Sequence, residues 1–338
     1  MYIYDIDKRE IIDTIQDIGY IVDITSNSDG SIISFSSENH WDFKKDESYS
    51  TEKAVYTYKL NSDMKYKPLT DPIVTPVFVK PKYIDDPDAK VNRLYMSSDG
   101  KKLIVNYSGS TQHFGFIFVY HYDNENNNWK QVQVIMENDF KKDTELTEFP
   151  DLNLCSISDD FTTFLVFDWR RDRALVYKLN NDKYLPKGNY LNWDGDETFN
   201  GYDNGAIDST GNRIALFVDG GDLVVVYDYI ESTNKWIEIQ RISKPKDISY
   251  NIYFGRSLTF TNKGKQLLIG TNIGNFVNIY NLDPNDNQYN FFQRLTSVNS
   301  KTYFGSENAK TSQDGSIIAI VDRSVGSSIG GISIFRKN

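Results

Sequence analysis

The residues best suited to binding chemistry lie in a loop between two apolar runs. This loop reads Asp168-Trp169-Arg170-Arg171-Asp172-Arg173 and is the densest basic and aromatic stretch in the chain. Trp and Arg are the residue types that most often anchor protein interfaces. A plain hairpin loop, with its arginines paired to neighbouring aspartates, is the alternative interpretation. The partner-binding residues that we predict are Trp169, Arg170, Arg171, Arg173, Trp193 and Trp41.

The best acidic cluster follows Trp193 and contains Asp194, Asp196 and Glu197. Its carboxylates could bind Ca²⁺, which takes six to eight oxygen ligands. Their spacing matches no complete calcium-loop signature, so these three residues are only weak metal candidates. We predict no metal and no other cofactor.

The remaining reactive side chains form no catalytic constellation. His40, His113 and His121 are scattered, and no two of them have the spacing of zinc ligands. Cys155 lies in an apolar run, where a buried thiol is the usual outcome. We therefore predict no catalytic residue.

A repeated sequence motif indicates which elements position these loops. Ser-x-Asp-Gly, or a variant, is followed each time by an apolar run, and Asp-Gly between apolar runs predicts a hairpin turn. An apolar run ending in Tyr or Phe then predicts a third strand, and Trp-x-x-x-Gln-x-Ile or a variant predicts a fourth. The turn glycine or its replacement falls at positions 30, 100, 160, 211, 264 and 315.

Four strands per repeat of about fifty residues indicate a β-propeller. We predict an all-β fold, a single β-propeller domain over residues 1–338 with six four-stranded blades, seven being the alternative. The chain ends after a third strand, so the N-terminal strand is expected to pair with the C-terminal one and close the ring, which removes exposed edges.

The repeated side chains have structural roles in this prediction. The turn aspartates Asp29, Asp99 and Asp314 are expected to bond within their hairpins. Trp129 and Trp236 are expected to pack between blades. The motif glutamines are expected to bond backbone at the outer strands; they are Gln133, Gln240 and Gln293.

The repeat unit resembles the FG-GAP propeller repeats found in the heads of integrin α chains. The residues that carry this resemblance are Phe254-Gly255-Arg256-Ser257, Tyr303-Phe304-Gly305-Ser306 and Trp129-x-x-x-Gln133-x-Ile135. The resemblance implies a β-propeller over nearly the whole chain. FG-GAP repeats of integrins often carry an Asp-x-Asp-x-Asp-Gly calcium loop, and no hairpin of this sequence has it.

Composition excludes several classes of protein. The 338 residues carry a formal charge of −10, which argues against nucleic-acid binding, because phosphate contacts need clustered Lys and Arg. A single cysteine excludes an intramolecular disulfide. We find no signal peptide and no apolar run long enough for membrane insertion, so we expect a cytoplasmic or virion location rather than secretion.

The main functional hypothesis is a non-enzymatic propeller that acts as a scaffold binding a protein partner. Abundant Asn, Ile, Lys, Asp and Tyr make a virion or assembly component a sub-hypothesis. One alternative is glycan binding, as in a lectin, through Trp41, Trp169 and Trp193. The other is a lactonase-like, metal-dependent hydrolase with ligands from the first strands of the blades, for which the candidates are Asn92, Asn153, Asp203 and Asn308.

Overall fold

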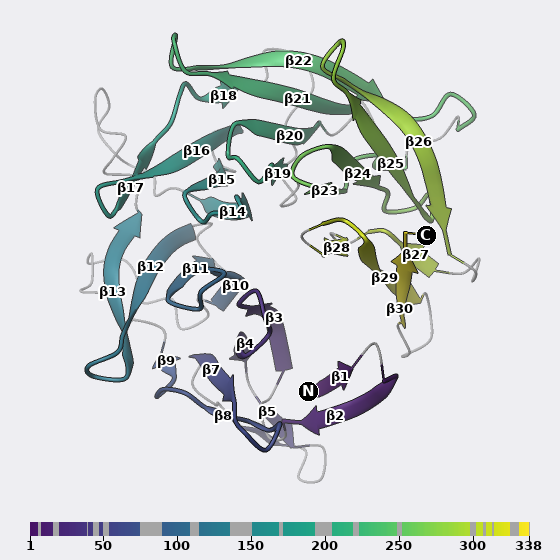
Figure 1. Ribbon diagram of the computed structural model, residues 1–338. Coiled ribbons are helices and arrows are strands. Elements are labelled where there is room, and N and C mark those ends of the chain that lie inside the picture. The colour runs from purple at the N-terminus through teal and green to yellow at the C-terminus, as the bar shows by residue number, and fades with distance from the viewer. Residues whose placement is uncertain are drawn as a thin grey trace. The chain divides into compact units, whose positions relative to one another are not determined.

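The computed structural model contains strands and no helix among the residues it describes (Figure 1). The chain divides into two compact units, Met1–Asn153 and Leu154–Asn338, which are considered separately below. The described residues are 1–5, 8–15, 20–38, 40–42, 47–49, 54–74, 90–108, 115–135, 151–168, 172–192, 205–218, 223–248, 252–297, 302–306, 309–312, 314–324 and 331–337.

Unit 1 contains two antiparallel sheets, blades 1 and 2, whose strands follow one another in chain order. Blade 1 consists of β3 (Tyr20–Ser26), β4 (Ile32–Glu38), β7 (Ala54–Leu60) and β8 (Tyr66–Pro68), with β9 (Ile73–Val74) also paired to β7. Blade 2 consists of β10 (Lys90–Met96), β11 (Lys102–Ser108), β12 (Gly115–Asp123) and β13 (Asn128–Ile135). Two short hairpins accompany them: β1 (Tyr2–Asp5) with β2 (Glu10–Thr14), and β5 (His40–Asp42) with β6 (Glu47–Tyr49).

Unit 2 contains blades 3 to 6, except that the first two residues of blade 3, Leu152 and Asn153, belong to unit 1. Blade 3 consists of β14 (Leu152–Ile157), β15 (Thr163–Asp168), β16 (Arg173–Asn180) and β17 (Lys183–Pro186), with β18 (Leu191–Asn192) also paired to β16. Blade 4 consists of β19 (Gly205–Ile207), β20 (Arg213–Val218), β21 (Leu223–Ile230) and β22 (Lys235–Ser243). Blade 5 consists of β23 (Ser257–Thr261), β24 (Gln266–Gly270), β25 (Phe276–Asp283) and β26 (Gln288–Thr296). Blade 6 consists of β27 (Thr302–Phe304), β28 (Lys310–Thr311), β29 (Ile317–Ser324) and β30 (Gly331–Arg336).

These six antiparallel sheets confirm the predicted fold class, a six-bladed β-propeller. In blade 6, β27 and β28 are two pieces of the first strand, because both pair with β29. The strand pairings of the described residues lie within blades or hairpins, and β1 pairs with β2. A single domain over 1–338, and its closure by the terminal strands, therefore stay predictions.

One hydrogen bond joins β2 to blade 1 within unit 1. The backbone N–H of Tyr66 in β8 donates to Oδ2 of Asp13, across 2.8 Å. In unit 2, the N–H of Tyr289 in β26 donates to Oε1 of Gln240 in β22, across 2.7 Å. β2 therefore lies beside blade 1 as the outer strand of blade 4 lies beside blade 5.

The repeated turn has the predicted hydrogen bonds. Oδ1 of Asp99 accepts from Oγ of Ser97 at 2.6 Å and from the N–H of Lys101 at 3.0 Å. Oδ1 of Asp29 accepts from the N–H of Ser31, and Oδ1 of Asp314 is held in the same way as that of Asp99.

Blade 3 corrects one assignment. Position 160 was expected to replace the turn glycine, but Phe161 takes that place, with φ of 59°. Its N–H donates to the carbonyl of Ser158, as the N–H of Gly100 does to the carbonyl of Ser97. The turn carboxylate in this blade is Asp160, which accepts from Oγ of Ser158.

The Phe-Gly phrases bring one blade against the next. Gly305 has φ of +80°, and a Cβ there would lie 2.5 Å from Cγ2 of Val277 in blade 5. Only glycine combines this backbone conformation with so close an approach.

The Trp-x-x-x-Gln phrase owes its spacing to a β-bulge. The register shifts within the pairing of β12 with β13, β21 with β22 and β25 with β26, and each shift skips the residue before the motif Gln. Nε1 of Trp129 donates to Oγ1 of Thr57 in blade 1 at 3.0 Å, which confirms packing between blades. Nε2 of Gln240 donates to the carbonyl of Tyr289, which confirms the backbone role for this glutamine.

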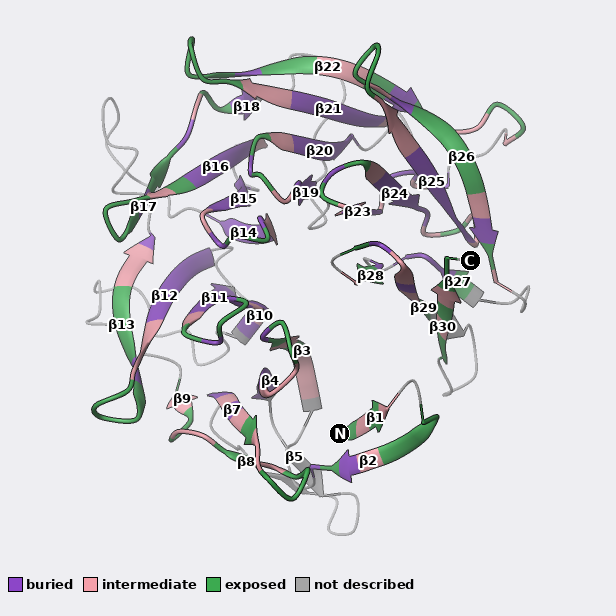
Figure 2. Ribbon diagram, in the orientation of Figure 1, coloured by how far each residue is buried: buried purple, intermediate pink, exposed green. Residues whose placement is uncertain are grey.

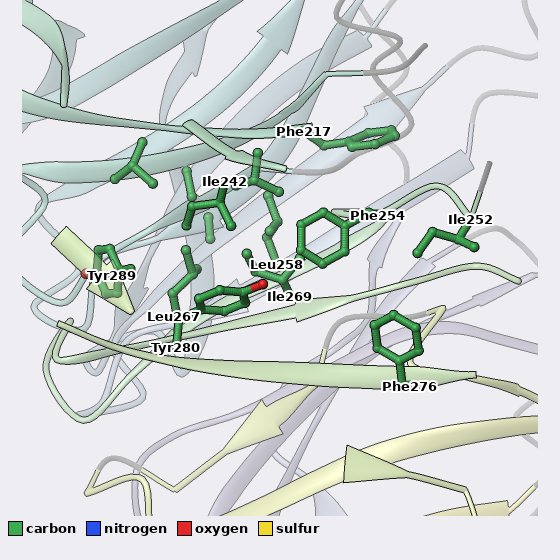
Figure 3. Packing of buried hydrophobic residues seen from close by; sticks show 14 residues of the cluster. Phe217, Ile242, Ile252, Phe254, Leu258, Leu267, Ile269, Phe276, Tyr280 and Tyr289 are labelled. Atoms are coloured by element: carbon green, nitrogen blue, oxygen red, sulfur yellow. The ribbon is translucent and has the colours of Figure 1, made fainter. Parts of the chain in front are cut away.

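The core lies within and between neighbouring blades. Figure 2 shows buried residues concentrated on the second and third strands, such as β11, β12, β20 and β21, while β22 and β26 are largely exposed. Between blades 4 and 5, Phe217 and Ile242 pack with Phe254, Leu258 and Leu267 (Figure 3). None of the described residues forms a helix with the length and apolar character that a membrane crossing requires.

Candidate functional site

Two asparagines from the predicted first strands meet at the start of β10. Nδ2 of Asn92 donates to Oδ1 of Asn153 across 2.8 Å. Asn92 lies at a β-bulge, because Val91 pairs with Tyr107 and Arg93 with Asn106. A bulge redirects the side chain of its extra residue, which here turns the Asn92 amide toward residue 153.

Asn106 fixes the backbone beside this pair. It is fully buried in β11, and its Nδ2 donates to the carbonyls of Phe116, at 3.1 Å, and Leu152, at 2.8 Å. A Cβ on Gly115 would lie 2.2 Å from the Leu152 carbonyl oxygen, so the backbones approach very closely here. The polar side chains of Asp151 and Asn153, both largely buried, are therefore anchored on either side of residue 152.

Side chains of β3 hold the other end of β10. Oδ2 of Asp23 accepts from the N–H of Leu94 at 2.7 Å, and Oγ1 of Thr25 accepts from the N–H of Met96 at 3.1 Å. Leu94 is buried, whereas Arg93 before it is half-buried, as expected for strand residues on opposite faces. We name Asn92, Arg93, Asn106, Asp151 and Asn153 the β10 polar cluster.

The β10 polar cluster combines amide and guanidinium N–H donors with one carboxylate. Such groups can bind hydroxyl and carbonyl oxygens of a small polar ligand. A metal-dependent hydrolase would need more ligands, and within the described residues no three His, Cys, Asp or Glu side chains are placed to hold a metal ion. Two of the four ligand candidates of that alternative, Asp203 and Asn308, lie outside the described residues, and we route no step through a metal.

Arg173 is the one predicted partner-binding residue whose side chain is described. Its Nη2 forms an ion pair with Oδ2 of Asp168 at 3.2 Å, and its guanidinium carbon lies 4.4 Å from the ring centroid of Tyr190. Asp168 is 1% exposed, so this ion pair anchors the end of the loop. The pairing matches the hairpin-loop interpretation, while a role in partner binding stays a prediction.

The other predicted site residues can be placed only in part. Trp41 lies in β5, and nothing is described of its side chain. Cys155 is buried in β14, as expected. The candidates outside the described residues are Trp169, Arg170, Arg171, Trp193, Asp194, Asp196, Glu197, Asp203 and Asn308.

Sequence reasoning missed three members of the β10 polar cluster. Asn106 lies between the apolar run Leu103-Ile104-Val105 and Tyr107, and a polar residue inside such a stretch is the signal that could have found it. Arg93 follows Asn92 directly and Asp151 precedes Asn153 by two residues, and neither carries a comparable local signal.

No family model matches the chain, and no curated protein matches it. Among solved structures, it is similar to a periplasmic gluconolactonase of Pseudomonas aeruginosa, with 15% identity, 99% of this chain and 91% of that chain covered, and a TM-score of 0.59. The propeller of Dos1 matches with 14% identity, 98% and 72% coverage and a TM-score of 0.58. A protein of Bacteroides fragilis provisionally named a 6-phosphogluconolactonase matches with 14% identity, 98% and 89% coverage and a TM-score of 0.56.

The class that fold and comparisons define is the β-propeller. The finer FG-GAP resemblance has no support from a family model. The comparisons contradict the main functional hypothesis, a non-enzymatic binding scaffold, because similar structures that cover nearly the whole chain are named as lactonases.

Proposed function

We propose that this protein is a lactonase-like hydrolase that opens the ring ester of a sugar lactone. The observation that carries the proposal is the likeness of 99% of the chain to a propeller named as a gluconolactonase. The β10 polar cluster supports it, because its groups suit a small ligand rich in oxygen atoms.

Lactone hydrolysis requires two things of a protein. Water attacks the ring carbonyl carbon, so negative charge develops on the carbonyl oxygen and must be stabilised by N–H donors. A base must take the proton of the attacking water. The ring C–O bond then breaks, and the alkoxide that leaves takes up a proton to give the open hydroxy acid.

The β10 polar cluster contains groups for both tasks. An asparagine amide has two N–H donors. One N–H of Asn92 is engaged by Asn153, which orients the amide and leaves the second for a carbonyl oxygen. Arg93 supplies further donors from the next position, and Asp151 supplies the carboxylate that accepts the water proton. Asn106 is a positioning residue, because it acts through the backbone of Leu152.

The proposal is tested by proton release from glucono-1,5-lactone and from its 6-phosphate ester. We expect the purified protein to open at least one of them well above the uncatalysed rate, with saturation in lactone. An open-chain methyl gluconate serves as the control ester and should react far more slowly. Ring opening of both lactones at the uncatalysed rate would refute the proposed function.

A further inference from the structure

An outer-strand tyrosine holds the first turn in three of the blades. In each case its hydroxyl donates to the carbonyl of the turn residue that has the left-handed backbone conformation. The bonds are Tyr66 to Gly30, Tyr184 to Phe161 and Tyr289 to Gly264. In blades 1, 3 and 5 this hydrogen bond links the outer strand to the turn between the first two strands.

Blade 4 lacks this tyrosine, because Trp236 occupies the same position as Tyr289. The indole Nε1 of Trp236 donates elsewhere, to the carbonyl of Lys187, at 3.0 Å. The turn carbonyl of Gly211 accepts instead from the ammonium Nζ of Lys187, at 2.5 Å. A lysine from blade 3 thus replaces the missing hydroxyl of blade 4.

The ammonium of Lys187 lies in a closed polar and aromatic environment. The residue is 5% exposed. Its Nζ also donates to Oδ1 of Asn212 at 2.7 Å, and lies 4.2 Å from the ring centroid of Tyr229 and 5.3 Å from that of Trp236. These distances are those of cation–π contacts, which partly offset the loss of hydration.

The two residues after Lys187 complete the contact. Gly188 has φ of +78°, and a Cβ there would lie 2.6 Å from Cδ1 of Trp236. Oδ1 of Asn189 accepts from the N–H of Trp236 at 2.8 Å. Residues 187–189 therefore contact Trp236 through two hydrogen bonds and through the close approach of Gly188 to the indole ring.

We propose that Lys187 is a titratable clasp that joins blade 3 to blade 4 and makes this junction respond to pH. This proposal is independent of the proposed hydrolysis. The same lysine provides a hydrogen-bond donor, a cation for two aromatic rings and a backbone acceptor for Trp236. Loss of its proton leaves the donor and the acceptor but removes the cation.

The charged groups around Lys187 come from four neighbouring segments. Lys178 in β16 opposes the ammonium; Glu231 after β21, Asp208 after β19 and Asp160 after β14 favour it. Burial is the largest influence and lowers the pKa of Lys187 to about 8. The phenol of Tyr229 has its pKa raised, so it stays neutral where Lys187 titrates.

The direction of the pH effect follows from proton linkage. An unfolded lysine has a pKa of about 10.4. Between pH 8 and that value, the unfolded chain binds more protons than the folded one, so stability rises with pH. Well below pH 8, Lys187 is protonated in both the folded and the unfolded state, so its contribution to the free energy of unfolding no longer changes with pH. For a pKa of about 8, the unfolding equilibrium constant should fall roughly thirtyfold from pH 8 to pH 10.

The test is urea unfolding of the full chain between pH 7 and pH 10. Lys187→Arg keeps a cation and its donors but does not titrate in this range, and Lys187→Met removes the ammonium. The matched control is Lys183→Met, at an exposed lysine of β17, the outer strand that ends just before Lys187. We expect the resistance of wild type and of the control to urea to rise above pH 8. Neither Lys187 variant should show this rise. An unchanged rise in Lys187→Arg, or no rise in wild type, would overturn the proposal.

Discussion

The carboxamide of Asn92 donates to that of Asn153 across 2.8 Å, which joins the bulged start of β10 to the first residues of β14. A half-buried amide held in this way keeps one N–H for a ligand, which is why the proposed hydrolysis is assigned to this end of β10.

The packing of Trp236 against blade 3 leads to a prediction about stability. Trp236→Ala should lower the free energy of unfolding by about 3–5 kcal/mol, because a large buried aromatic side chain is lost. Ile237→Ala, at a neighbouring side chain that is 46% exposed, should change it by less than about 1 kcal/mol. Urea denaturation measures both variants. Equal effects of the two would show that the indole is not a packing element.

Alanine substitutions at two glycines with positive φ distinguish the stability cost of a steric clash from that of backbone strain. Gly30 and Gly305 both have positive φ, of +70° and +80°. A Cβ on Gly30 meets nothing within 4 Å, whereas one on Gly305 would lie 2.5 Å from Val277. Gly30→Ala should therefore cost only the strain of a left-handed residue, about 1–2 kcal/mol. Gly305→Ala should cost clearly more by thermal unfolding, and a smaller loss than Gly30→Ala would contradict the close approach.

The turn carboxylates predict how the protein responds to acid. Hydrogen bonds from Ser312 and Ser316 lower the pKa of Asp314 to about 2. An unfolded aspartate has a pKa of about 3.9. Its contribution to stability is therefore complete above that value and is lost as pH falls toward 2.

Asp314→Asn should flatten the acid dependence of the melting temperature between pH 4 and pH 2. Asp71→Asn, at an exposed loop position, serves as the control and should follow wild type. An Asp314 variant with the full wild-type acid dependence would exclude this turn as a source of it.

The repeats made most of the fold predictable from the sequence. Each Ser-x-Asp-Gly copy specifies its own turn through local hydrogen bonds, so Asp99 and its equivalents could be assigned from neighbouring residues alone. The role of Trp129 followed in the same way, since the motif recurs with one spacing. Phe161 was misassigned because a non-glycine residue at positive φ has no sequence signature as strong as Asp-Gly.

The candidate site was less predictable for a physical reason. Asn92 and Asn153 are far apart in the sequence, and their contact depends on a bulge that moves one residue out of the strand register. The role of Lys187 is equally non-local, because it compensates for a tyrosine that is replaced by Trp236 in the next blade. Local patterns identify elements, whereas such contacts depend on how the elements pack.

The measurement that tests the central claim most directly is kcat/KM for ring opening by wild type, Asn92→Ala and Asn126→Ala, made with whichever of glucono-1,5-lactone and its 6-phosphate ester wild type opens faster. Asn126 lies in an exposed turn of the same blade and serves as the control. Loss of one N–H donor to a developing oxyanion typically costs about 10²–10³-fold in rate. We predict a loss of that size in Asn92→Ala and wild-type activity in Asn126→Ala, with both variants folded. Wild-type protein that accelerates ring opening of neither lactone, or Asn92→Ala with undiminished activity, would contradict the account.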